Sequence, residues 1–356
     1  MDTCPVVPIS AIDPGTPQEL LRALMRTHNG QPVSIDEIGS FVVAADEQTF
    51  LHLLTRDGDK STHPENADQN PIDRVRTQLR ASFNPSRTRP IAEAVLREVS
   101  RLIDETADAS SLELVGSVFV PAATRVLFTC LGIDPACAHE SATKFLAAQK
   151  TSDRSSLQKK LQTVVGEEVL PHLSADGTLR QLQASHKLQE AKIIDIVMLL
   201  MMVGIEPVAN LTAITLERSL RTAPLFYDQR HAENSYHYVV ENDSPIYPGI
   251  YRTSSTTMAV DGYEHPPGTQ FLIPSIACDG IGSKREPRRS LTFGAGNRRC
   301  IAEHLSSTLV VGMVDTILSA GASAVKTLTW RVNLPRGISA MSCTFDVSRP
   351  IRRGTP

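Results

Sequence analysis

The chain has 356 residues, 41% of them hydrophobic, and a formal net charge of −3 at pH 7. This length allows a sizeable core, and no stretch resembles a linker, so we expect one domain over residues 1–356. The slightly acidic balance excludes a generally basic nucleic-acid-binding protein. We therefore expect no nucleic-acid partner.

Two features of the sequence bear on location. The first ten residues, MDTCPVVPIS, have neither the basic region nor the apolar core of a signal peptide. The longest largely apolar run, Ile193–Val203, is shorter than the roughly 18 residues that span a bilayer. We expect a cytoplasmic protein without membrane contact. The six cysteines show no CxxC pair and no zinc-like spacing, and a cytoplasmic setting disfavours disulfides.

The first two thirds of the chain are mostly helical in pattern. Residues 60–71 are polar, contain two prolines and show no periodicity, which predicts a loop. Residues 140–190 are only weakly amphipathic and predict short, compressed helices. The clearer segments are a strand at 41–44 and helices at 46–54, 72–80, 91–106 and 112–131.

The longest helical signal covers Ile193 to Arg221 and is at first apolar nearly all round, as in a helix through the middle of a domain. Gly204, Glu206 and Pro207 lie in its centre. Proline has no amide hydrogen and clashes with the preceding turn, so we expect a kink there.

The last third contains the β signals and a glycine-rich loop. Residues 249–253 to 267–269 predict two strands joined by an Asp261-Gly262 turn. Two closing strands are expected near 328–331 and 336–338.

The central motif of the chain is Phe293-Gly294-x-Gly296-x-Arg298-x-Cys300. Two glycines at alternate positions let the backbone turn tightly and lie close to a flat surface. An apolar-periodic run follows, so Cys300 is expected at the start of a helix, where the dipole lowers a thiol's pKa. The pattern indicates a thiolate ligand for a planar cofactor; a core cysteine in a glycine turn is the alternative.

This loop resembles the haem-binding loop of the cytochrome P450 family, with Ala302 where the family usually has glycine. The resemblance implies a mainly α fold with a small β subdomain, and haem b with Cys300 as the axial iron ligand. The loop between the family's B and C helices, the lid helices and the meander before the cysteine loop would all be shortened.

The resemblance also implies roles for residues elsewhere. Arg76, Arg252 and Arg298 match the positions that hold the haem propionates, and a forked guanidinium suits a carboxylate. From its own stretch, Arg76 is equally well explained as part of a solvated basic helix face. Gly204 and Glu206 match the oxygen-binding groove, and Pro207 replaces the family's threonine, which puts ordinary oxygen activation in doubt.

A second departure concerns the family's Glu-x-x-Arg pair. The matching positions before Asp243-Ser244-Pro245 hold Tyr238 and Glu241. The meander that this pair normally holds is also cut down. Both halves of one ionic network are missing together, which indicates a reshaped proximal face, since losing only one partner would leave a buried charge uncompensated.

The expected function is that of a haem-thiolate oxidative enzyme acting on a small metabolite of secondary metabolism, free or carrier-tethered. The oxidant could be dioxygen or peroxide, or the reaction could be redox-neutral. The alternative is a non-catalytic partner, similar to the haem-free relatives that activate glycosyltransferases. The basic stretch from Lys284 to Arg299 suits an acidic ferredoxin-type partner, or is a loop kept soluble by its charges.

Overall fold

We describe the fold from a computed structural model, in which the chain divides into two compact units. The sheet unit comprises Met1–Asn70, His237–Cys300 and Arg331–Ser339; the helical unit comprises Pro71–Tyr236, Ile301–Trp330 and Ala340–Pro356. The structure describes residues 6–7, 30, 32–35, 39–44, 53, 71–105, 112–149, 154–222, 229–246, 249–275, 291–296, 299–320, 324–333 and 337–346. Of the expected helix at 46–54 only Leu53 is among these residues, and the expected loop at 60–70 and most of the meander lie outside them.

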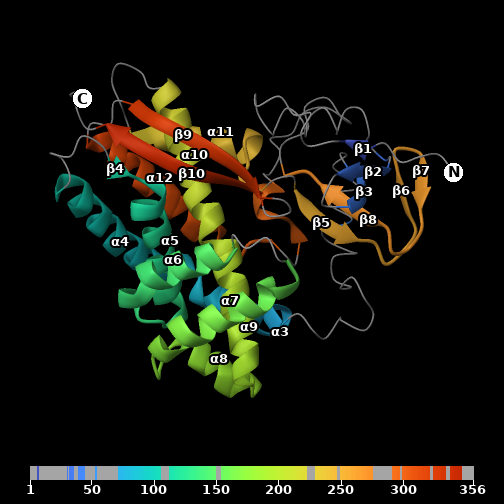
Figure 1. Ribbon diagram of the computed structural model, residues 1–356, viewed down its shortest axis with the longest axis horizontal. Coiled ribbons are helices and arrows are strands. Elements are labelled where there is room, and N and C mark those ends of the chain that lie inside the picture. The colour runs from blue at the N-terminus through green and yellow to red at the C-terminus, as the bar shows by residue number, and fades with distance from the viewer. Residues whose placement is uncertain are drawn as a thin grey trace. The chain divides into compact units, whose positions relative to one another are not determined.

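The helical unit holds the larger core (Figure 1). Its helix α11, Gln229–Asn242, continues into the sheet unit. The other helices are α3 Pro71–Ser82, α4 Pro85–Glu105, α5 Val120–Leu131, α6 Ala138–Gln149, α7 Arg154–Glu168, α8 Thr178–His186, α9 Glu190–Gly204, α10 Glu206–Thr222 and α12 Glu303–Ser319. Three single turns, η4 Val115–Phe119, η5 Pro135–Cys137 and η6 Leu170–His172, connect them.

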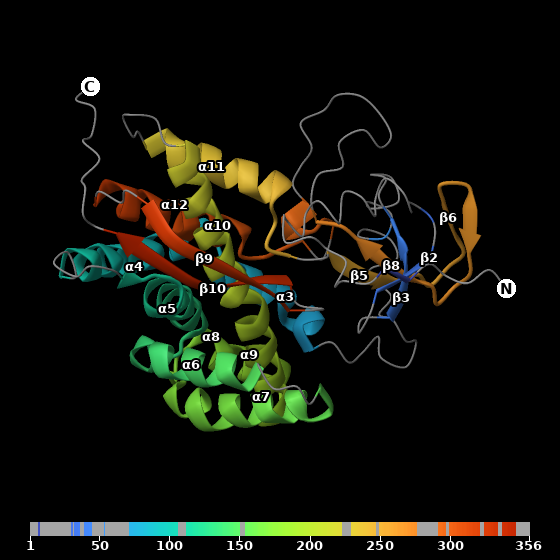
Figure 2. The same cartoon turned by 45° about the horizontal axis from the view of Figure 1, so that its top comes forward.

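Helices α4 and α12 pack closely along each other (Figure 2). Val95 and Val99 are buried on α4, and Leu309 and Met313 are buried on α12. Gly312 permits the close approach, since a Cβ there would lie 2.4 Å from Leu96 Cδ1. The apolar face predicted after Cys300 is therefore the face that α12 buries.

A second close approach joins the end of α5 to the start of α8. Gly132 ends α5 with φ 75°, and a Cβ there would lie 2.3 Å from the Cα of Gly177. Thr178, the first residue of α8, donates from its hydroxyl to the carbonyl of Cys130 at 3.0 Å. Only glycine combines this backbone conformation with this spacing.

The long central helix is interrupted, as Pro207 predicts. Helix α9 ends at Gly204, Ile205 is outside both helices, and α10 begins at Glu206. Taken as one stretch, Glu190–Thr222 is long and apolar enough to cross a membrane, which the count of continuous apolar residues did not anticipate. Half of its most apolar window is buried within the protein, and a core helix passes the same test.

The sheet unit contains a five-stranded sheet with the order β1-β2-β3-β8-β5. Its strands are β1 Val6–Val7, β2 Pro32–Ile35, β3 Gly39–Val43, β5 Ile250–Thr253 and β8 Gln270–Ile273. Strand β8 pairs in parallel with β3 and antiparallel with β5. The strand expected at 41–44 is thus confirmed, one residue displaced.

A hairpin of β6 Met258–Val260 and β7 Tyr263–His265 turns through Asp261 and Gly262. Both turn residues have positive φ, 50° and 83°, as a two-residue hairpin turn requires. The prediction of two strands over residues 249–269 was wrong in number, because β5, β6 and β7 all lie there and β8 begins at the next residue. The turn itself is where the sequence predicts it.

A third sheet has the order β4-β10-β9, with β4 Leu112–Glu113, β9 Ala324–Asn333 and β10 Gly337–Asp346. The two closing strands are confirmed and are longer than expected. The helix expected from residue 112 was wrong at its start, because Leu112 and Glu113 pair with β10. The Glu113 carboxylate accepts from the amides of Val115, Gly116 and Ser117 and so begins the helix two residues later.

Candidate functional site

The cysteine loop closes on itself through backbone hydrogen bonds. The amide of Cys300 donates to the carbonyl of Phe293 at 2.7 Å, and the amide of Arg299 donates to the carbonyl of Gly296 at 3.2 Å. Gly294 and Gly296 have φ of 69° and 62°. These left-handed conformations favour glycine, which explains why the motif has glycine at both positions.

The loop is also tied to α11. The hydroxyl of Thr292 donates to the carbonyl of Val240 at 2.7 Å, and Thr292 lies in the single turn η7, Leu291–Phe293. The helix that carries Tyr238 and Glu241 is therefore bonded to the cysteine loop through a neutral hydrogen bond. The sequence indicated the loss of the ionic pair but did not reveal this contact, since 52 residues separate its partners.

Cys300 is exposed and is in no disulfide. The expectation that it begins a helix was wrong by three residues: Ala302 is the N-cap and α12 starts at Glu303. A turn at Ile301 and Ala302 intervenes, so the thiol is presented by the closed loop and not by a helical turn.

The break between α9 and α10 exposes part of the central helix. Val203 is 56% exposed, and Gly204, Glu206 and Pro207 are half-buried. The missing side chain of Gly204 faces α5, because a Cβ there would make ordinary contact with Leu127 Cδ2 at 3.5 Å. Close approach of a cofactor to Gly204 thus remains a prediction.

The three arginines expected to hold the propionates lie in different parts of the chain, and the structure describes two of them. Arg76, on α3 in the helical unit, is half-buried. Arg252, on β5 in the sheet unit, is half-buried and donates from Nη1 to the carbonyl of Tyr251 at 2.7 Å. Arg298 lies outside the described residues, and of the six basic residues from Lys284 to Arg299 only the half-buried Arg299 is described. Propionate binding and partner docking stay predictions.

Comparison with known proteins gives no match to any family model and no match among curated proteins. Solved structures do match. P450BioI in complex with an acyl carrier protein ligated to hexadec-9Z-enoic acid has a TM-score of 0.70 at 15% identity, covering 93% of this chain and 98% of that one. The myxobacterial cytochrome P450 CYP267B1 in complex with myristic acid gives 0.70 at 16%, covering 94% and 96%. The cytochrome P450 TxtC, which hydroxylates thaxtomin, gives 0.71 at 15%, covering 94% and 100%.

The chain has the cytochrome P450 fold. The expected architecture, mainly helical with a small β region, is thereby confirmed over most of the chain. The identity is too low to carry residue roles across, so the site has to be judged on its own residues.

The residues of this P450 fold suit a haem held by a thiolate. Cysteine is among the residue types most often buried, so an exposed cysteine on a closed, hydrogen-bonded loop is well placed for a ligand that covers it. Within the part of the chain that the structure describes, no group of three or more His, Cys, Asp and Glu could hold a metal ion. Cys300 could supply a single thiolate ligand, and a haem iron suits such a site because the porphyrin supplies most of its other ligands.

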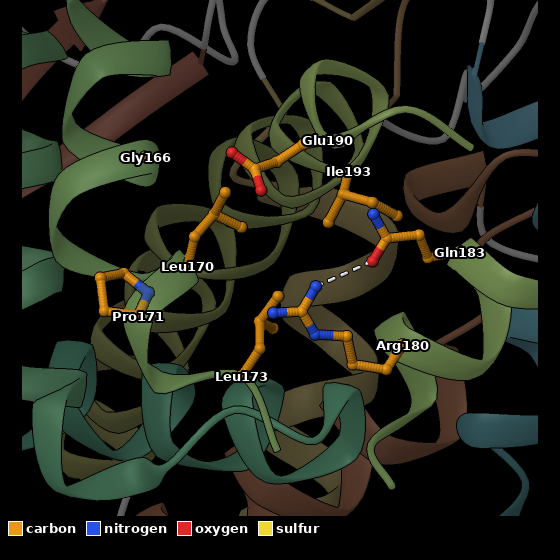
Figure 3. Close-up of a pocket in the computed structure, with 8 residues that line it drawn as sticks. All are labelled: Gly166, Leu170, Pro171, Leu173, Arg180, Gln183, Glu190 and Ile193. Atoms are coloured by element: carbon orange, nitrogen blue, oxygen red, sulfur yellow. Dashed lines mark hydrogen bonds between the residues drawn. The ribbon is translucent and has the colours of Figure 1, made fainter. Parts of the chain in front are cut away.

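The P450-fold chain also has a pocket that sequence reasoning did not predict. It lies between the end of α7, the turn η6, helix α8 and the start of α9, with a volume of about 250 Å³ (Figure 3). Leu170, Leu173 and Ile193 supply apolar walls, and Arg180, Gln183 and Glu190 supply polar groups. Arg180 Nη1 donates to Gln183 Oε1 at 2.9 Å. No motif marks these residues, because helix packing alone brings them together.

Proposed function

We propose that the chain is a haem-thiolate oxidative enzyme with Cys300 as the iron ligand. The observation that carries the proposal is the closed loop from Phe293 to Cys300, with two left-handed glycines, in a chain of P450 fold. Arg76, Arg252 and Arg298 are proposed to hold the propionates. When bound, haem ligated by a thiolate supplies the oxidising chemistry, because the thiolate pushes electron density onto the iron.

The chain's own residues are proposed to set how protons reach the reacting centre. Pro207 has neither the threonine hydroxyl nor an amide hydrogen, so it cannot donate to a ligand. The half-buried Glu206, next to the helix break, remains as the nearby acid. We propose that a substrate hydroxyl or a water does the work of the missing hydroxyl, or that peroxide is the oxidant.

For the substrate we propose a small organic metabolite of secondary metabolism, free or tethered to a carrier protein. Three solved neighbours support this class: P450BioI was crystallised with a loaded acyl carrier protein, TxtC hydroxylates thaxtomin, and HmtN is a post-tailoring hydroxylase of himastatin biosynthesis. The likeness to HmtN has a TM-score of 0.64 at 15% identity. An acidic ferredoxin-type protein is the proposed electron donor, at the basic stretch 284–299.

The test is the difference spectrum of the reduced, carbon-monoxide-treated protein. The proposal expects a Soret band typical of thiolate ligation, which Cys300→Ala abolishes. Cys137→Ala, at a half-exposed thiol on another part of the chain, is the matched control and should leave the band unchanged. A folded protein that takes up no haem would overturn the proposal.

Oxygen use is tested separately with Pro207→Thr. If dioxygen is the oxidant, we expect this variant to convert a larger share of consumed reductant into product. Equal turnover of wild type and variant with hydrogen peroxide would instead indicate peroxide chemistry. Equal product formation without any oxidant would indicate a redox-neutral reaction.

A second candidate is a non-catalytic auxiliary protein that activates a glycosyltransferase-type partner. The sequence of α11 supports this candidate, because Tyr238 and Glu241 replace the family's ionic pair. It predicts a folded protein without haem that raises the activity of a partner enzyme in a coupled assay. Retention of the cysteine loop argues against it.

A further inference from the structure

We propose that the pocket between α7, α8 and α9 binds a small zwitterion with an apolar body, of the α-amino acid class. This site is independent of the cysteine loop and of the proposed haem chemistry. The pocket lies wholly within the helical unit, between α7, η6, α8 and α9.

The pocket has one positively and one negatively charged side chain, which suits a ligand that carries both a carboxylate and an ammonium group. In Figure 3 the guanidinium of Arg180 and the carboxylate of Glu190 extend into the same hollow from different sides. Both residues are in the described part of the chain, and no ion pair within 4.0 Å joins them there. Each charge can therefore meet a ligand group of opposite sign.

Arg180 is held in place for this role. Its bond to Gln183, three residues later on α8, uses one guanidinium nitrogen and fixes the plane of the fork. The remaining N–H groups can bind a carboxylate, which guanidinium groups often bind through two parallel hydrogen bonds. Arg180 and Gln183 are half-buried, so this anchor is less exposed to water than a surface arginine.

Glu190 supplies the opposite pole. It stands in the first turn of α9, is exposed, and forms part of the rim of the pocket. A ligand ammonium there would replace bulk water beside the carboxylate. Because an exposed ion pair contributes little to binding, neither charged group alone would hold a ligand, and both groups with the apolar walls are needed.

The size and walls of the pocket select the ligand body. About 250 Å³ is below the 300–1,000 Å³ of pockets that hold drug-sized molecules, so the ligand is small. The side chains of Leu170, Leu173 and Ile193 line it, and they favour an aliphatic group over a polar one. An amino acid with a branched aliphatic side chain is small, carries both charges and has an apolar body, so it fits the pocket in all three respects.

The experiment is a titration of the full-length protein with L-leucine, followed by calorimetry or by amide chemical shifts. Two half-ligands are compared: 3-methylbutanoate, which has the carboxylate alone, and 3-methylbutylamine, which has the ammonium alone. We expect saturable, millimolar binding of leucine, about tenfold weaker binding of 3-methylbutylamine, which lacks the carboxylate for Arg180, and up to about fivefold weaker binding of 3-methylbutanoate. No saturable binding of leucine, or equal binding of either half-ligand, would overturn the proposal.

Variants assign the binding to this pocket. Arg180→Gln should weaken leucine binding about tenfold and Glu190→Gln by up to about fivefold, and Arg180→Lys should lose part of the binding because a lysine has no planar fork. Arg89→Gln and Glu93→Gln make the same charge changes at exposed positions of α4 and should leave binding unchanged. Unaltered binding in both pocket variants, with folding verified by circular dichroism, would contradict the assignment. The haem spectrum should be the same in all of these variants, so this result is read independently of the proposed function.

Discussion

The hydroxyl of Thr292 donates to the backbone carbonyl of Val240 across 2.7 Å, joining the cysteine loop to the last turns of α11. In chains with an ionic pair on this helix, charge can hold the neighbouring segments; here a neutral hydrogen bond links the helix to the cysteine loop. A neutral bond needs no buried charge, so losing the Glu-x-x-Arg pair leaves no uncompensated ion behind.

Thr292→Val removes this bond while keeping the shape of the side chain. We expect a loss of about 1 kcal/mol in the free energy of unfolding, the usual contribution of such a bond. Amide hydrogen exchange at Cys300 should quicken, because its bond to Phe293 depends on the anchored turn. Thr316→Val is the matched control, since the Thr316 hydroxyl bonds only to Gly312 of its own helix. Equal exchange at Cys300 in both variants would contradict the anchoring role.

Substitutions at Gly132 and Gly262 can separate the stability cost of a left-handed backbone from the cost of disturbing close packing. Both have positive φ, but a Cβ at Gly132 would overlap the backbone of Gly177, whereas nothing lies within 4 Å of a Cβ at Gly262. We expect Gly262→Ala to cost about 1 kcal/mol, from left-handed strain alone. Gly132→Ala should cost clearly more, because two backbone segments must also move apart. Chemical denaturation of both variants gives the comparison, and equal losses would show that the approach at Gly177 is unimportant.

Pro207→Ala restores an amide where the central helix is interrupted. We expect the new amide at position 207 to be protected from hydrogen exchange by the carbonyl of Val203, with α9 and α10 joined into one helix. Pro90→Ala is the control, because Pro90 lies inside α4 and that helix is continuous already. Rapid exchange at position 207 would mean that packing around Ile205, and not the proline, interrupts the helix.

Cys130 gives a prediction about alkaline pH. Burial raises the pKa of its thiol from 9.0 to about 12, against a smaller lowering by Arg87. Between these values the unfolded chain loses the proton and the folded protein keeps it. Stability should therefore fall as pH rises above 9, by up to about 1.4 kcal/mol per pH unit from this group.

Cys130→Ala should flatten that slope, measured by denaturation at several pH values from 8 upward. Cys137→Ala serves as the comparison, because burial raises the pKa of that thiol too, but at a half-exposed site. A slope that is as steep in Cys130→Ala as in the wild type would show that other groups cause the alkaline loss.

The features that sequence reasoning found are those coded within short stretches. The glycines at 294 and 296, the Asp261-Gly262 turn and the interruption before Pro207 all follow from backbone chemistry at the residues themselves. The helix starts at 115 and 303 were missed by a few residues, because the Glu113 carboxylate and the turn at Ile301 decide them locally in ways that periodicity does not reveal.

By itself, the sequence determined the cysteine loop, since its turn depends on glycines at fixed positions, and the resemblance of that loop to the cytochrome P450 family implied the architecture. Only the tertiary structure decided which distant residues meet: Thr292 with Val240, Gly132 with Gly177, and Arg180 with Glu190 around one pocket. The physical reason is that the period of apolar residues shows which face of a helix is buried but not which distant segment covers that face.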